Sequence, residues 1–294
     1  MRIFVTGATG FIGSAVVHEL IEAGHQVVGL ARSDTAAASL TAVGAEVHRG
    51  ALDDLDALRR GTLATDGVIH LAFIHDFSNF AAAAEIDRLA IEAMGAALEG
   101  SDKPFVGTSG TLMLTSGRLG TEEDTPISAT PRRSEEVALA LAARGVRSSV
   151  VRLAPSVHGP GDHGFIPWLI GIARDKGVSA YIGDGSNRWP AVHRLDAARL
   201  FRLAVEGAPA GSRLHGVGDE GVPFRDIAGI IGRHLNLPVV SIPREEADAH
   251  FGWLSFAASA DNPTSSALTQ ERLGWRPVHP GLIPDLEEGH YFHG

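Results

Sequence analysis

The stretch RIFVTGATGFIGSAVVHEL, residues 2–20, decides the fold of this chain. Ile3 to Val5 form an apolar run that is too short for a helix and closes on a glycine, as is typical of a strand buried on both faces of a parallel sheet. From Ile12 the apolar residues recur every three or four positions, which predicts a helix ending near Gly24. Residues 25–30 then predict a second strand. Strand, turn, helix and strand together predict a right-handed βαβ unit.

Three glycines, Gly7, Gly10 and Gly13, follow the first strand at intervals of three residues. The first permits a tight turn, the second lets a pyrophosphate approach the backbone, and the third lets the helix pack closely on the strand. Amide groups at the amino end of the helix then face the anion. The spacing therefore predicts a dinucleotide site, and a purely structural glycine turn is the alternative.

The second strand ends in Ala31-Arg32-Ser33-Asp34. A carboxylate at this position holds the ribose 2′-hydroxyl of NAD, whereas an arginine accommodates the 2′-phosphate of NADP. Arg32 and Ser33 therefore favour NADP, with NAD as the less favoured alternative. Asp34 lies two residues after the position of the NAD-binding carboxylate, and we expect it to cap a helix that begins near Thr35.

Composition limits the function classes. The 294 residues are 44% hydrophobic, which suffices for one large α/β domain or two domains that share a core. The formal charge of −10 disfavours nucleic acid and anionic membranes as partners, and we expect a small-molecule substrate instead. The absence of cysteine excludes disulfides and thiolate metal sites, and no His-Glu-x-x-His spacing predicts another metal site. No leader or spanning segment is recognisable, so the expected location is cytoplasmic.

Several motifs occur in one order along the chain: TGATGFIG at 6–13, ARS at 31–33, GALDD at 50–54, VIHLA at 68–72, LAPSVHGPG at 153–161, GDGSNRWPAVHRLDAARL at 183–200 and LGW at 273–275. Together they resemble the extended short-chain dehydrogenase/reductases, the group of epimerases, dehydratases and reductases. The resemblance implies an α/β fold with a Rossmann-type doubly wound parallel sheet and a smaller C-terminal substrate lobe.

The expected boundaries follow from this resemblance and from the apolar patterning. Residues 1–153 form the dinucleotide-binding domain, with 191–213 packing back on it, while 154–190 and 214–294 form the substrate lobe. The strands are predicted near 2–6, 26–30, 46–48, 67–71, 104–108 and 147–153, and a helix is predicted near 194–206.

The resemblance also implies which residues meet the cofactor. They belong to the glycine turn, the end of the second strand, the segment near the adenine, the ends of the next strands and the region around the sixth strand. The residues are Gly7, Thr9, Gly10, Phe11, Ile12, Gly13, Arg32, Ser33, Leu52, Asp53, Leu71, Ala72, Phe73, Thr108, Arg132, Pro155 and Val157.

The usual proton donor of this family is missing. Relatives use a tyrosine with a lysine four residues later, but the chain has only Tyr181 and Tyr291, and neither is followed by such a lysine. The expected tyrosine position holds Ile127 or Ser128, and the expected lysine position holds Pro131 or Arg132. An arginine stays protonated, so Arg132 or Arg133 is suited to hold the ribose or a substrate anion and unsuited to donate a proton.

Ser109, after the strand at 104–108, resembles the family serine whose hydroxyl polarises a substrate carbonyl; a hydroxyl bonded to backbone is the alternative. The candidate proton donors are His158, His163 and His75, because imidazole titrates near neutral pH. For each of them a structural role is the competing interpretation. His193 is expected to bond Asp196 and to be structural.

The favoured function is an NADP-dependent oxidoreductase that reduces a small or medium carbonyl, imine or activated alkene. A non-catalytic NAD(P)-binding sensor, or an epimerase or dehydratase, is the alternative. Phe73, Phe77, Phe165 and Trp168 are expected to line the pocket, which favours an apolar substrate. Arg188 is either a pocket residue or exposed. The helix at 85–98 is either core or the two-fold interface of a homodimer.

Overall fold

The structure is a computed structural model that describes residues 1–75, 79–112, 114, 117–125 and 132–293. Its centre is a seven-stranded sheet in the order β10-β6-β5-β4-β1-β2-β3, in which all neighbouring strands are parallel. The strands are β1 (Arg2–Thr6), β2 (Gln26–Ala31), β3 (Glu46–Arg49), β4 (Gly67–His70), β5 (Pro104–Gly110), β6 (Arg147–Leu153) and β10 (Ser212–Gly216). The doubly wound parallel sheet predicted from the sequence is confirmed, and its six predicted strands lie within one or two residues of their expected bounds.

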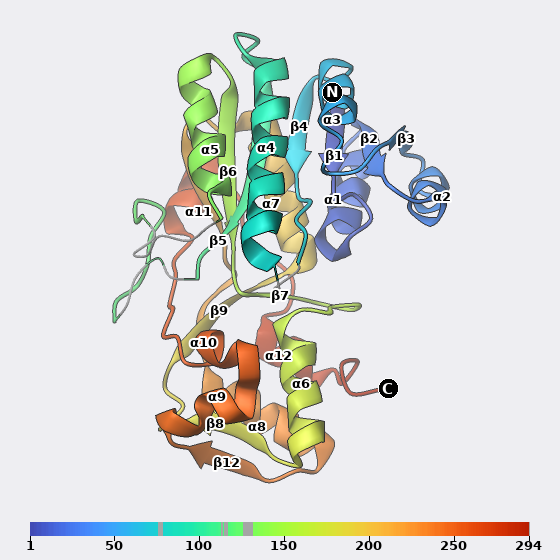
Figure 1. Ribbon diagram of the computed structural model, residues 1–294. Helices are drawn as coiled ribbons and strands as arrows, with labels where there is room; N and C mark the ends of the chain where they lie inside the picture. The colour runs from blue at the N-terminus through green and yellow to red at the C-terminus, as the bar shows by residue number, and fades with distance from the viewer. Residues whose placement is uncertain (76–78, 113, 115–116, 126–131, 294) are drawn as a thin grey trace.

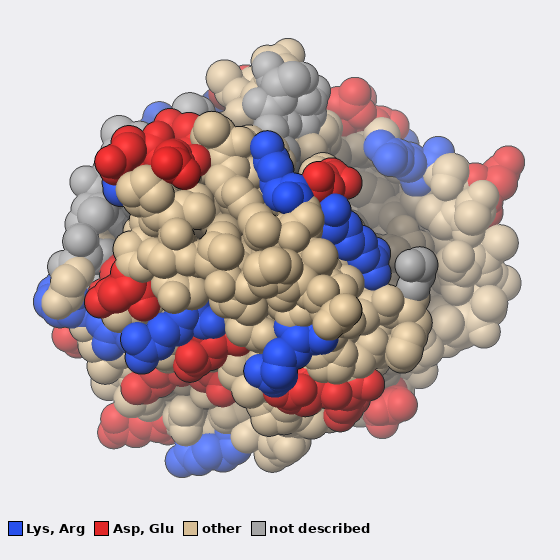
Figure 2. Space-filling model, turned by 90° about the horizontal axis from the view of Figure 1, so that it is seen from below, with Lys and Arg blue, Asp and Glu red and all other residues tan. Residues whose placement is uncertain are grey.

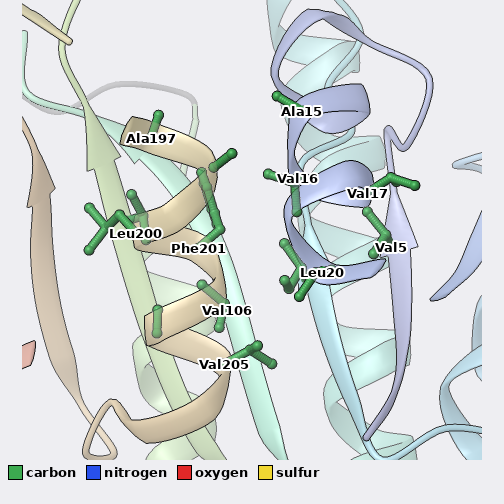
Figure 3. Close-up of a cluster of buried hydrophobic side chains, with 14 of the residues drawn as sticks. Val5, Ala15, Val16, Val17, Leu20, Val106, Ala197, Leu200, Phe201 and Val205 are labelled. Atoms are coloured by element: carbon green, nitrogen blue, oxygen red, sulfur yellow. The ribbon is translucent and has the colours of Figure 1, made fainter. Parts of the chain in front are cut away.

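Helices cover both faces of this sheet. On one face α1 (Phe11–Glu22) and α7 (Arg194–Gly207) lie side by side and bury Val16, Leu20 and Phe201 against the strands (Figure 3). On the other face, α3 (Leu55–Leu63), α4 (Phe80–Leu98) and α5 (Ser134–Ala140) form a second cluster around Phe4 and Phe105. The remaining elements around this sheet are α2 (Asp34–Ala42), the 3₁₀ turn η2 (Leu141–Arg144) and α11 (Ala267–Leu273).

The second part of the chain builds a smaller lobe below the sheet (Figure 1). Its buried cluster includes Trp189, Phe224 and Phe251. Its strands are β7 (Ser156–His158), β8 (Ser179–Ile182), β9 (Arg188–His193), β11 (Asp219–Pro223) and β12 (Val239–Ile242). Its helices are α6 (Phe165–Lys176), α8 (Phe224–Leu235), α9 (Ala247–Phe251), α10 (Ser255–Ala258) and α12 (Leu282–Glu287), with 3₁₀ turns η3 (Arg244–Glu246) and η4 (Gly252–Leu254).

The sheet fixes where a ligand can meet the fold. The strand order reverses between β1 and β4, and in such sheets ligands bind outside the carboxyl ends of the strands at this reversal. These carboxyl ends point toward the small lobe (Figure 1). The glycine turn follows β1 and residues 71–75 follow β4, so both segments lie at the reversal.

The helix expected at 85–98 is the longer α4, and its buried side faces the sheet. Ala83, Ile91 and Met94 are buried there, while Leu89 is 36% exposed on the outer side. The helix is therefore part of the core on one side, and the homodimer interface stays a prediction for the other.

No helix in the described ranges combines the length and apolar character that crossing a bilayer requires. Seen from below, the surface carries acidic and basic groups in alternation around uncharged areas (Figure 2). The formal net charge of the whole chain is −10. On this face the basic groups form no continuous area of the kind that binding to nucleic acid needs.

Candidate cofactor and substrate site at the strand reversal

Close backbone packing explains two of the three glycines after β1, Gly7 and Gly13. Gly7 has φ +67°, and a Cβ on it would lie 2.8 Å from the backbone nitrogen of Ala72. A Cβ on Gly13 would lie 1.9 Å from the carbonyl oxygen of Gly7. Both positions therefore exclude any side chain, and the turn after β1 is held directly against the segment that follows β4.

The amino end of α1 is open. Its N-cap residue Gly10 supplies no side-chain hydrogen bond, whereas Ser33 caps α2 by accepting from the Ala36 amide at 3.1 Å and Asp54 caps α3 by accepting from the Ala57 amide at 2.9 Å. Within the described chain, the amides of residues 11–13 donate no hydrogen bond. Free amides at a helix amino end are a phosphate site, so the residues present fit a dinucleotide.

The end of β2 differs from the prediction in one respect. Ser33 caps α2, so the expectation that Asp34 is the cap is wrong: Asp34 is already the first helical residue, and its carboxylate accepts from Arg49 at 2.6 Å. Arg32 is exposed beside it, and among the described residues it forms no ion pair. In the described chain the Arg32 guanidinium thus has no charged partner at the end of β2, where the sequence analysis predicts the 2′-substituent of the ribose.

The other predicted cofactor residues lie along the same edge. Leu52 packs against the core cluster beneath α3, and Asp53 is exposed. Pro155 and Val157 are half-buried at β7, and Leu71 packs on the cluster beneath α1. Their contacts with a cofactor stay predictions.

The ends of β4 and β5 bring a cation to an aromatic ring. The Arg132 guanidinium lies 4.1 Å from the centroid of Phe73, and its Nη2 donates to the carbonyl oxygen of Thr108 at 3.2 Å. Ser109, the next residue of β5, is half-buried. The adjacent Arg133 points outward and pairs with Glu136, so of the two arginines only Arg132 belongs to this site.

Two candidate histidines face this cluster. The His75 ring contacts Phe73 edge-on at 5.2 Å, and the His163 ring contacts Phe11 edge-on at 5.7 Å. Burial, together with the positive charges of Arg132 and His163, lowers the pKa of His75 below its ordinary value. The structure therefore brings His75, His163 and Arg132 together. We call this group, with Phe73 and Ser109, the switch-point site.

His158 lies elsewhere. It is fully buried in β7, and its Nδ1 bonds the carboxylate of Asp285 at 2.9 Å. Its ring contacts His193 edge-on at 5.4 Å, and both line a cavity of about 130 Å³ with Asp219 and His279. Within the described chain no contact joins His158 to His75, so the structure does not bring these two candidates together.

The expected bond between His193 and Asp196 is not made. Asp196 accepts instead from His279 Nδ1 at 2.9 Å and from two backbone amides. The Nδ1 of His193 accepts from the amide of Leu195 at 3.3 Å, so His193 caps α7, which is a structural role.

The remaining aromatic and basic candidates lie in different environments. Arg188 forms a bidentate pair with Asp261. Phe165 contacts Trp189 inside the small lobe, while Trp168 is 52% exposed beside Trp253. Phe77, Ile127, Ser128 and Pro131 lie outside the described residues.

Three polar residues of this region were missed by the sequence analysis. His70, Asp87 and Ser134 are at most 3% exposed and form a hydrogen-bonded chain that ends on Arg132. One signal was present: Asp87 is the single charged residue on the buried face of α4.

Comparison with known proteins agrees with this architecture. The model of the NAD dependent epimerase/dehydratase family matches residues 3–214. An uncharacterized protein of Schizosaccharomyces pombe is 55% identical over 99% of this chain and 100% of its own length. The 2-alkyl-3-oxoalkanoate reductase of Stenotrophomonas maltophilia is 28% identical over 85% of this chain and 79% of its own.

Among solved structures, the dTDP-glucose 4,6-dehydratase DesIV of Streptomyces venezuelae, solved with NAD and TYD bound, has a TM-score of 0.78. The match covers 98% of this chain and 96% of the dehydratase, at 22% identity. At this identity the likeness shows the fold alone.

Proposed function

This chain belongs to the NAD-dependent epimerase/dehydratase family, and we propose that within it the chain is an NADP-dependent reductase of ketones with apolar substituents. The observation that carries the proposal is the switch-point site: a fixed guanidinium, a serine hydroxyl and two histidines gather beside the glycine turn. Family members are NAD(P)-dependent oxidoreductases, epimerases and dehydratases.

The choice of NADP rests on charge. Arg32 is an unpaired cation among the described residues, and the carboxylate of Asp34, which follows two positions later, is occupied by Arg49. A free guanidinium binds a phosphate with a bidentate fork, and it has no comparable partner in a 2′-hydroxyl.

The proposed chemistry uses few side chains. When bound, the reduced cofactor supplies a hydride to the carbonyl carbon. The Ser109 hydroxyl donates a hydrogen bond to the carbonyl oxygen, where negative charge develops. His75 in its imidazolium form then gives that oxygen a proton, which completes the alcohol. Arg132 holds the ribose end of the cofactor.

The environment of His75 gives this proposal a pH signature. Since burial and the nearby Arg132 and His163 lower the pKa of His75, its imidazolium is a stronger acid than that of an ordinary histidine, but it is populated only at lower pH. The rate of reduction should therefore fall as pH rises through this lowered pKa.

The apolar substituents are suggested by two observations. Phe73 and Phe11 present aromatic rings at the site, and an aromatic lining suits apolar groups. The bacterial relative is named for a ketone that carries alkyl chains.

The test follows NADPH absorbance with a panel of aldehydes, ketones, 2-alkyl-3-oxo acids and cyclic imines. We expect turnover on ketones, a loss of at least about tenfold in Ser109→Ala, and a pH–rate profile that becomes flat in His75→Asn. A pH–rate profile that is unchanged in His75→Asn but flat in His163→Asn would instead identify His163 as the proton donor. NADPH binding without turnover on any compound would contradict the reductase and favour a sensor.

A further inference from the structure

A chain of buried polar side chains runs from the end of β1 to the switch-point site. Thr6, His70, Asp87 and Ser134 are each 3% exposed or less. Thr6 Oγ1 lies 2.7 Å from His70 Nδ1, and His70 Nε2 lies 3.0 Å from Asp87 Oδ1. The Ser134 hydroxyl donates to Asp87 Oδ2 and accepts from Arg132 Nε at 2.9 Å. Thr6 directly precedes Gly7, so the chain links the glycine turn to Arg132.

The hydrogen bonds in this chain converge on Asp87 from both sides. A carboxylate only accepts, so both His70 Nε2 and the Ser134 hydroxyl donate to Asp87. The other ring nitrogen of His70, Nδ1, is hydrogen-bonded to the Thr6 hydroxyl. Thr6 Oγ1 in turn accepts from the amide of Ala72 at 3.3 Å.

The guanidinium of Arg132 is fixed from several sides. Besides its bond to Ser134, it donates from Nη2 to the Thr108 carbonyl and lies over the ring of Phe73. Thr108 Oγ1 donates to the carbonyl oxygen of His70 at 2.7 Å, which ties β5 to β4 at the same point. Strand ends and side chains therefore determine the plane of the guanidinium.

A buried carboxylate must be stabilised by hydrogen bonds or nearby positive charge, because it loses its hydration on folding. Burial alone would raise the pKa of Asp87, but the bonds from His70 and Ser134 and the charges of His70 and Arg132 bring it below its ordinary value. Asp87 is thus held as an anion between His70 and Ser134, and in the described chain these two side chains are its hydrogen-bond partners.

We propose that Asp87 is a positioning residue, which through Ser134 holds Arg132 as the fixed cation of the cofactor site and through His70 and Thr6 ties that cation to the glycine turn. This inference rests on the proposed function, in that Arg132 contacts bound NADPH. It assigns the orientation of this cation to an aspartate–serine–arginine chain.

A double-mutant cycle tests the proposal. NADPH affinity is measured by fluorescence titration for the full chain and for Asp87→Asn, Arg132→Met and the double variant, and each variant is also melted to check folding. We expect Asp87→Asn to weaken NADPH about 5- to 20-fold, but less than about twofold in the Arg132→Met background, because the same contact has already been lost. Ser134→Ala should behave like Asp87→Asn and disturbs packing less, so it serves if Asp87→Asn does not fold.

The control is Arg88→Ala on the outer side of α4, where Arg88 pairs with Glu85 and Glu92 within the described chain. Its NADPH affinity should equal that of the unmodified chain. Equal losses for Asp87→Asn and Ser134→Ala with and without Arg132 would overturn the inference, since a purely structural effect is additive. Failure of the unmodified chain to bind NADPH would instead refute the proposed function.

Discussion

Replacement of Arg32 by alanine gives the sharpest test of cofactor choice. Arg32 is exposed and makes no ion pair in the described chain, so its removal should leave the fold unchanged. A hydrogen bond between charged groups contributes roughly 1.5–3 kcal/mol. Since about 1.4 kcal/mol corresponds to a factor of ten, Arg32→Ala should weaken NADPH about 10- to 100-fold.

NADH lacks the 2′-phosphate, so its affinity should change less than about threefold in the same variant. The matched control is Arg49→Ala. Its guanidinium is neighbouring and also exposed, but it is engaged by Asp34, so both affinities should stay within about twofold. Calorimetric titration of the purified chain with both coenzymes measures these ratios.

Two results would refute the reasoning. Equal losses of NADPH and NADH would show that Arg32 acts on a part common to both coenzymes. Tighter binding of NADH than NADPH by the unmodified chain would show that the end of β2 selects a 2′-hydroxyl in spite of its free guanidinium.

Two further predictions concern stability. Glu135→Gln should cost about 3–5 kcal/mol in urea unfolding, because it leaves the fully buried Arg152 without its carboxylate, whereas Glu136→Gln on the surface should cost less than about 1 kcal/mol; equal costs would contradict this. Burial and the charges of His158 and His279 lower the pKa of His193 to about 4. Between pH 6.5 and 4 the unfolded chain therefore binds one proton more than the folded chain, and the free energy of unfolding decreases as the pH decreases. The stability lost from pH 7 to pH 5 should be about 2 kcal/mol smaller in His193→Gln than in the unmodified chain. An identical loss would exclude His193 as the cause.

The sequence predicted the sheet well because its signals are local. An apolar run such as residues 3–5, closed by a glycine, defines a buried strand without reference to the rest of the chain. The glycine spacing also predicted the close backbone packing of this turn. Gly13 lies against Gly7, and Gly7 lies against Ala72, so neither position has room for a side chain. Backbone packing of this kind is encoded in a few consecutive residues.

The site chemistry was less accessible because it depends on distant partners. His158 and His75 were equivalent candidates by residue type and by position after a strand. Only the fold shows that Asp285, 127 residues later, binds the first, while Arg132 and His163 surround the second. The cap of α2 was missed for a smaller reason: Ser33 and Asp34 are both good N-cap residues, and the sequence does not fix the first helical turn to one residue.

Asp87, the proposed positioning residue, breaks the pattern of its helix in a way that the sequence shows. On α4 it occupies the buried stripe with Ala83, Ala90, Ile91 and Met94, where an apolar residue would stabilise the helix at no electrostatic cost. A carboxylate at that place is compatible with folding only if distant donors satisfy it, and here His70 and Ser134 do so from β4 and α5. The break in the apolar pattern of α4 is thus the sequence feature that corresponds to the proposed positioning residue. In the proposed reductase, the cation beside Phe73 at the strand ends is therefore an arginine that a buried aspartate orients through Ser134.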